Sequence, residues 1–202
     1  MSWADSVSVA VGTQVEKGTH LTVVDLRNGS HRNDYNVPDS IIYAVSPLRD
    51  GWTYVSPATG RLVIVRNGQK REIERPRWFQ NIVGTAGSFD GKNLMYWGWN
   101  NGSNDSIGYV LMPLDGGESK QVFTSFAESA NGSWLVDGTF LAHVWETPDA
   151  ATLTRLRFPG VERIGTVPHI GRVFSVSADM KRATLGWRDS RADAFMYRVV
   201  KQ

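Results

Sequence analysis

The chain has 202 residues, of which 41% are hydrophobic and 21% are charged, and its net charge is +2. This is the composition of a globular protein that buries a sizeable core, and so mild a charge argues against a nucleic-acid partner. The absence of cysteine excludes disulfides, thiolate metal sites and thiol catalysis.

The first segment is a short series of strands. Residues 7–12 and 21–26 are rich in β-branched residues and are predicted as strands, and Asn28-Gly29 is predicted as the turn into another. Only residues 1–5 remain for a preceding strand, and no acidic turn is recognised before it. We therefore expect this first unit to be incomplete.

The next two segments share one order of elements: a strand, an acidic turn, an aromatic or apolar strand, a loop and two more strands. In the second segment the turn is Asp50-Gly51, and in the third it is Asp90-Gly91. The Asp side chain accepts a hydrogen bond from the backbone of such a turn, and Gly accepts positive φ there. The third segment has its strands at residues 82–87, 94–99, 107–114 and 120–124.

The last two segments repeat this order less completely. Asp137-Gly138 and Asp179-Met180 mark their turns, and the fifth segment ends after a strand within residues 195–200, so it should lack its fourth strand. The four acidic turns follow one another at intervals of 40, 47 and 42 residues.

A period of 40–45 residues built from short strands is typical of a β-propeller. We therefore predict an all-β fold, a single β-propeller domain over residues 1–202 with about five four-stranded antiparallel blades, the first and last of them incomplete. The blade units are expected at roughly 1–38, 39–77, 78–125, 126–168 and 169–202. A β-sandwich is the alternative, since short strands recur there too, without the longer period.

The motif Ser-x-Asp-Gly-Lys, followed by a hydrophobic strand, a polar loop and a strand ending in Asp-Gly-Gly, resembles the TolB-like or WD40-like (PD40-type) bacterial propeller repeat. The stretches that carry the resemblance are 88–124 and 177–200. Such repeats occur in periplasmic TolB, in bacterial Ser/Thr kinases and regulators, and in the gating domain of prolyl-oligopeptidase-like peptidases. The motif specifies a blade and not an activity.

A search for catalytic and metal-binding motifs gives no site. There is no Gly-x-Ser-x-Gly nucleophile elbow, no phosphate-binding loop and no His-x-His pair. His143 is expected to be a packed strand residue, and the Asn-rich loop 100–105 lacks the Glu of a calcium-binding EF-hand. We therefore expect no catalytic residue, no metal site and no cofactor.

The positive candidate is a ring of aromatic residues on one face. The loops after the second strands and the connections between blades should converge there, and Trp and Arg are enriched in binding hot spots. Packing of these Trp residues between blades is the alternative. The candidate face consists of Trp78, Phe79, Trp99, Asn100, Trp145, Glu146, Trp187 and Arg188.

The sequence thus favours a non-enzymatic propeller that binds a protein or small-molecule ligand, as a sensor module or docking part of a larger bacterial protein such as a kinase or regulator. The alternatives are an accessory or gating propeller of a serine peptidase or carbohydrate-active enzyme, and a chain that serves mainly as a folding or assembly model. Open blade edges suggest a homo-oligomer. No membrane span and no signal peptide are predicted, and the compartment stays undetermined.

Overall fold

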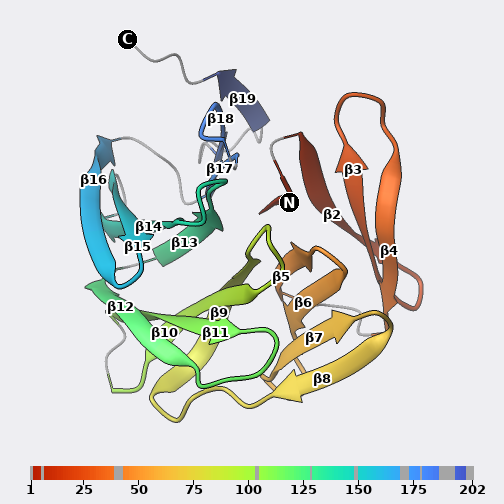
Figure 1. The fold of residues 1–202 in the computed structure, drawn as a ribbon, viewed down its shortest axis with the longest axis horizontal. Helices are drawn as coiled ribbons and strands as arrows, with labels where there is room; N and C mark the ends of the chain where they lie inside the picture. Colours follow the sequence, from red (N-terminus) through yellow and green to blue (C-terminus); the bar gives the residue numbers. More distant parts are fainter. Residues whose placement is uncertain are drawn as a thin grey trace.

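The computed structural model describes residues 2–5, 7–38, 43–102, 105–127, 129–147, 150–168, 173–177, 179–186 and 194–198. Within them the chain forms five antiparallel sheets, A to E, each from consecutive strands (Figure 1). Sheet A contains β1 (Ser2–Trp3), β2 (Ser8–Val15), β3 (Gly18–Asp25) and β4 (His31–Val37). Sheet B contains β5 (Tyr43–Leu48), β6 (Gly51–Val55), β7 (Leu62–Arg66) and β8 (Gln69–Ile73).

The remaining sheets follow in chain order. Sheet C contains β9 (Phe79–Gly87), β10 (Asn93–Asn100), β11 (Ser106–Pro113) and β12 (Lys120–Phe126). Sheet D contains β13 (Ser129–Trp134), β14 (Phe140–Thr147), β15 (Ala150–Arg157) and β16 (Gly160–Pro168). Sheet E contains β17 (Val173–Val176), β18 (Arg182–Gly186) and β19 (Ala194–Arg198).

The first strand of every sheet lies toward the centre of a ring and the last toward its rim (Figure 1). Around the ring β5 contacts β9, β9 contacts β13, β13 contacts β17, and β17 contacts β1. This arrangement confirms the predicted all-β propeller. Sheet A has three full strands besides the two-residue β1, and sheet E has three strands among the described residues.

The core lies between neighbouring sheets, as the wedge-shaped arrangement of a propeller requires. One cluster joins Leu62 and Ile64 of sheet B to Ile82 and Val110 of sheet C, and comparable clusters lie between sheets A and B and between C and D. Because sheet B is packed against sheet A on one side and sheet C on the other, β7 shows a continuous apolar run instead of strict alternation.

Two central strands place a glycine under an aromatic ring of the next strand. Trp97 is paired with Gly84 across β9 and β10, and a Cβ added to Gly84 would lie 2.0 Å from Cζ2 of that indole. Gly132 of β13 is paired with Ala142 of β14, and a Cβ added to it would lie 2.2 Å from Cζ of Phe140, two residues along the same strand. Because the two glycines have no side chain, the rings of Trp97 and Phe140 can lie directly over the backbone of the neighbouring strand.

The acidic turns between first and second strands have a common hydrogen-bond pattern. Oδ1 of Asp90 accepts from Oγ of Ser88 at 2.6 Å and from the Lys92 amide at 3.0 Å. These bonds lower the pKa of Asp90, the hydroxyl contributing most. Asp137 and Asp179 accept from the amide two residues later in the same way, at 3.0 and 3.1 Å. Each carboxylate thus fixes the turn that its sequence predicted.

Asp50 differs, because it forms a bidentate ion pair with Arg66 at the end of β7. Nε of Arg66 lies 2.9 Å from Oδ1 and Nη2 lies 2.8 Å from Oδ2. This pairing lowers the pKa of Asp50. The turn is therefore anchored to the third strand of its own sheet.

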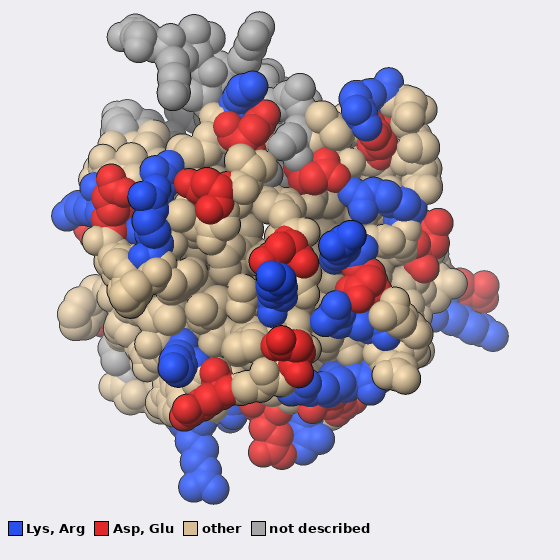
Figure 2. Space-filling model, viewed as in Figure 1, with Lys and Arg blue, Asp and Glu red and all other residues tan. Residues whose placement is uncertain are grey.

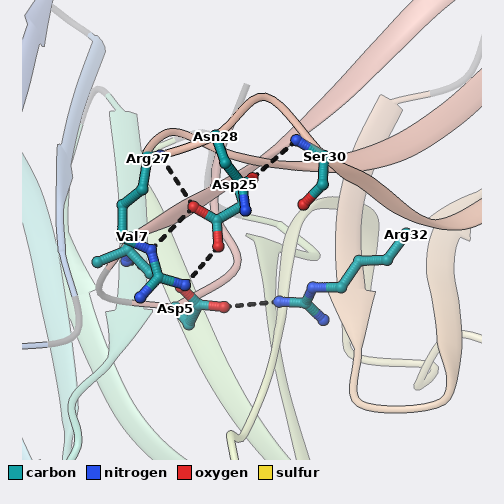
Figure 3. A network of polar contacts seen from close by, with 7 residues as sticks. All are labelled: Asp5, Val7, Asp25, Arg27, Asn28, Ser30 and Arg32. Carbon is teal, nitrogen blue, oxygen red and sulfur yellow. Dashed lines mark hydrogen bonds and ion pairs between the residues drawn. The ribbon is translucent and has the colours of Figure 1, made fainter.

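The expectation that no acidic turn precedes the second strand of the first unit is wrong. Oδ1 of Asp5 accepts from the Val7 amide at 2.8 Å, the relation found at Asp90, and Oδ2 binds Nη2 of Arg32 at 2.6 Å (Figure 3). Beside it, Oδ2 of Asp25 accepts a hydrogen bond from Nη2 of Arg27 at 2.5 Å. Hydrogen bonds from Arg27 lower the pKa of Asp25 to about 2. Asp5 stands 45 residues before Asp50, so the period extends to the first sheet.

Candidate functional site

The propeller has two faces of different construction. On the first, which we call the loop face, the loop between the second and third strands of sheet C meets the connections between sheets: the Asn101 amide donates to the Trp78 carbonyl at 2.7 Å, and the Ala127 amide to the Asp105 carbonyl at 2.8 Å. The opposite turn face carries the acidic turns, where the Leu114 amide donates to the Lys92 carbonyl at 2.7 Å.

The structure brings together four of the predicted site residues at the loop-face end of sheet C. Phe79 and Asn100 are paired across β9 and β10, with Trp78 and Trp99 next to them in the chain. Trp78 is 45% exposed, whereas Phe79 is fully buried in the core between sheets B and C. Trp99 is half-buried against the cluster between sheets C and D. Of the aromatic residues in this group, Trp78 offers the largest accessible surface.

The other predicted residues are dispersed. Trp145 is only 1% exposed and packs with Leu135, Leu141 and Ala151, so it belongs to the core. Glu146 is exposed, and its carboxylate lies 4.0 Å from Nη2 of Arg163. Trp187 and Arg188 lie outside the described residues.

Phe126, which was not among the predicted site residues, is 75% exposed at the end of β12. The Trp78 carbonyl accepts from Asn101 at the start of the loop between β10 and β11, and Ala127, the residue after Phe126, donates to Asp105 at the end of that loop. The two exposed aromatic residues therefore flank the same loop of sheet C. The signal was present: Phe123 packs into the core, and a residue three positions later on a strand points to the opposite side.

The loop between β10 and β11 is closed by Asn100. Its Nδ2 donates to Oγ of Ser106 at 2.8 Å, which joins the two ends of the loop. Its Oδ1 is buried without a hydrogen-bond partner, and a Cβ on Gly108 would come within 2.9 Å of that oxygen. The predicted role of Asn100 in ligand contact thus falls on a side chain turned largely inward.

The connection between sheets B and C, residues 74–79, is held by hydrogen bonds at successive carbonyls. The Pro76 carbonyl accepts from the Phe79 amide at 3.0 Å, and the Arg77 carbonyl accepts from Nδ2 of Asn101. The Phe79 carbonyl accepts from Nη1 of Arg75 at 2.8 Å. The Trp78 carbonyl accepts from the Asn101 amide, so all four carbonyls from residue 76 to residue 79 have hydrogen-bond partners. These bonds hold the backbone that carries Trp78 in place.

Charged side chains of both signs are interspersed over the face that Figure 2 shows, and on that face no broad area carries a single sign. At the connection 74–79, Arg61 pairs with Glu74 at 3.0 Å and with Glu72 at 3.6 Å. Arg75 and Arg77 form no ion pair with any other residue in the described ranges. This leaves a local excess of positive charge beside Trp78.

The turn face carries a shallow depression of about 300 Å³ between sheets C and D. It is lined by Phe89, Asp90 and Trp134 and by residues 135–138, where Val136 is 67% exposed. Both carboxylates that border it, those of Asp90 and Asp137, accept hydrogen bonds within their own turns. The depression contains none of the predicted site residues.

The described part of the chain contains no group of three or more His, Cys, Asp or Glu that could hold a metal ion. His143, expected to be packed, is fully buried on β14. Among the residues described, no helix is long and apolar enough to cross a membrane.

Comparison with known proteins gives a structural likeness alone: no family model and no curated protein matches the chain. The fold is similar to that of TolB from Acinetobacter baumannii, with a TM-score of 0.65 and 18% identity, over 96% of this chain and 51% of that one. It is also similar to the tricorn protease (TM-score 0.56, 12% identity, 96% and 29% covered) and to acylaminoacyl peptidase (0.52, 11%, 95% and 36%).

These similarities confirm the resemblance to TolB-like propellers that the turn motif predicted. The chain spans about half the length of the TolB structure. At sequence identities this low, the structural similarity shows a common fold and does not show a common activity.

Proposed function

We propose that this propeller is a non-enzymatic binding module and that its loop face docks a partner protein, with Trp78 and Phe126 as the main apolar contacts. The observation that supports the proposal most is the pair of exposed aromatic side chains on either side of one loop of sheet C. Large exposed apolar side chains grouped on one face are typical of interaction sites.

A binding role agrees with the fold and with the chemistry of the residues. Propellers present a broad face built from equivalent loops, and here the connection that carries Trp78 is held by hydrogen bonds at four consecutive carbonyls. Each lowered carboxylate pKa has a turn or an ion pair as its cause. These carboxylates therefore support a structural role, and the proposal needs no reacting group. The module would serve as the sensory or docking part of a larger bacterial protein.

The experiment is a quantitative affinity capture from extract of the source cells. The immobilised wild-type protein is compared with a Trp78→Ser/Phe126→Ser variant and with Val136→Ser, which removes an exposed apolar side chain from the turn face. We expect the double variant to lose partners that Val136→Ser retains. Identical sets of captured proteins for all three, with unchanged circular dichroism, would refute the proposal.

The second candidate is an accessory or gating propeller of a serine peptidase, supported by the similarity to the tricorn protease and acylaminoacyl peptidase. It predicts an α/β-hydrolase domain encoded in the same gene. A kinase or DNA-binding domain in that position would instead support the sensor role. Sequencing the flanking gene decides between them.

A further inference from the structure

The loop face has one place where apolar surface, positive charge and rigid backbone coincide, namely the connection 74–79. Trp78 is 45% exposed there, and the neighbouring Arg77 is exposed and has no ion-pair partner within the described residues. Phe126, on the other side of the loop, has no arginine next to it in the chain. The two aromatic positions therefore differ in the chemistry that surrounds them.

We propose that the connection 74–79 selects the partner, and that the segment it binds carries an Asp or Glu carboxylate next to an apolar side chain. This inference rests on the proposed function of the loop face. The apolar side chain would pack against the Trp78 indole, and the carboxylate would pair with the Arg77 guanidinium, whose fork of donors matches a carboxylate.

The charges around the connection support an acidic segment. Arg75 and Arg77 are uncompensated, whereas Glu74 and Glu72 are already paired with Arg61. Asp105 lies at the far end of the sheet C loop, where its carbonyl meets Ala127 on the Phe126 side. An approaching carboxylate thus meets two guanidinium groups that have no ion-pair partner, of which Arg75 already donates one hydrogen bond to the Phe79 carbonyl, while the neighbouring Glu72 and Glu74 are paired.

The hydrogen-bonded backbone of the connection 74–79 favours binding by this small surface. Four consecutive carbonyls of the connection have hydrogen-bond partners, and two of those partners come from Asn101. A backbone fixed before binding loses little conformational entropy when the partner docks, so more of the contact energy appears as affinity. Two arginines are too few for nucleic acid, which needs many phosphate contacts for comparable affinity.

The test selects displayed random dodecapeptides on the wild-type protein, and the best binders are synthesised for fluorescence anisotropy. We expect peptides with Asp or Glu next to an aromatic or aliphatic residue. Arg77→Glu should weaken their binding at least tenfold, and Arg71→Glu, the same charge change on an exposed arginine of β8, should change it less than twofold. Replacing the acidic residue of the peptide by Lys should restore binding to Arg77→Glu.

The outcomes separate this inference from the proposed function. If peptides bind in a way that depends on Trp78 and Phe126 but show no acidic preference and no response to Arg77→Glu, the inference fails and the binding face stands. If no selected peptide loses binding to the Trp78→Ser/Phe126→Ser variant, both fail. A 15-residue oligothymidylate that binds more tightly than any selected peptide, and is lost in Arg77→Glu, would assign the connection to nucleic acid and overturn the inference.

Discussion

The contact between Trp97 and Gly84 predicts that Gly84→Ala strongly destabilises the fold. The new methyl carbon would lie 2.0 Å from the indole, against about 3.5 Å for van der Waals contact, so the ring must move by about 1.5 Å. That ring stacks on Tyr109 at 5.7 Å and donates from Nε1 to the Ala130 carbonyl of sheet D at 3.2 Å. The displacement therefore disturbs both sheet C and its junction with sheet D.

We expect a loss of about 2–4 kcal/mol in the free energy of unfolding. Overpacking of a core costs roughly 1–3 kcal/mol, and losing the bond to Ala130 adds about 1 kcal/mol. For a domain of this size the melting temperature should fall by roughly 4–16 °C. The assay is urea unfolding followed by far-UV circular dichroism, with an unchanged slope against denaturant.

Gly165→Ala is the matched control, because a Cβ at Gly165 has no neighbour within 4 Å. It should change stability by less than about 1 kcal/mol. A double-mutant cycle adds the specific test: once Trp97→Ala has removed the indole, Gly84→Ala should cost almost nothing. The steric reasoning is refuted if Gly84→Ala and Gly165→Ala are equally stable, or if the cost of Gly84→Ala persists without Trp97.

Two further predictions concern the turns. Arg27→Gln should raise the pKa of Asp25 from about 2 toward its ordinary 3.8, since hydrogen bonds from Arg27 are the main cause of the shift; a carbon-detected NMR titration of the carboxyl group measures this. Because the pKa of Asp25 is lower in the folded than in the unfolded chain, this carboxylate stabilises the fold at neutral pH, and the contribution is lost as the pH falls from about 4 to 2. If Asp25 titrates at the same pH in Arg27→Gln as in the wild type, the assignment of the shift to Arg27 is contradicted. Gly138→Ala should cost about 1–2 kcal/mol in urea unfolding, because φ is +78° and an alanine there is strained although it meets no neighbour, and equality with Gly165→Ala would contradict this.

The repeat period predicted the sheets well because it depends on local chemistry. Each Asp turn is made by one carboxylate and the amide two residues later, so the signal is complete within a few residues. The turn at Asp5 was missed since Ala4-Asp5-Ser6-Val7 contains no glycine. Met180 shows that glycine is not obligatory, because it adopts a φ of +56° in the corresponding turn of sheet E.

The candidate site was predicted less well because exposure depends on contacts between sheets. Trp99 and Trp145 both lie near the end of a second strand, and both directly precede a shift in strand register. Trp145 meets Leu135 and Ala151 and is buried, whereas Trp99 keeps part of its surface accessible. No pattern within either strand distinguishes the two outcomes.

The junction between the first and last sheets has a mechanical consequence. All described strands of sheet A come from residues 2–37 and those of sheet E from 173–198, so the ring closes by contact between β1 and β17 and not by a strand shared between sheets. Each ladder of backbone hydrogen bonds lies inside one sheet. A pulling force applied to residues 2 and 198 should therefore part the ring at this seam before any ladder is loaded, and a single-molecule trace should show a first extension at low force.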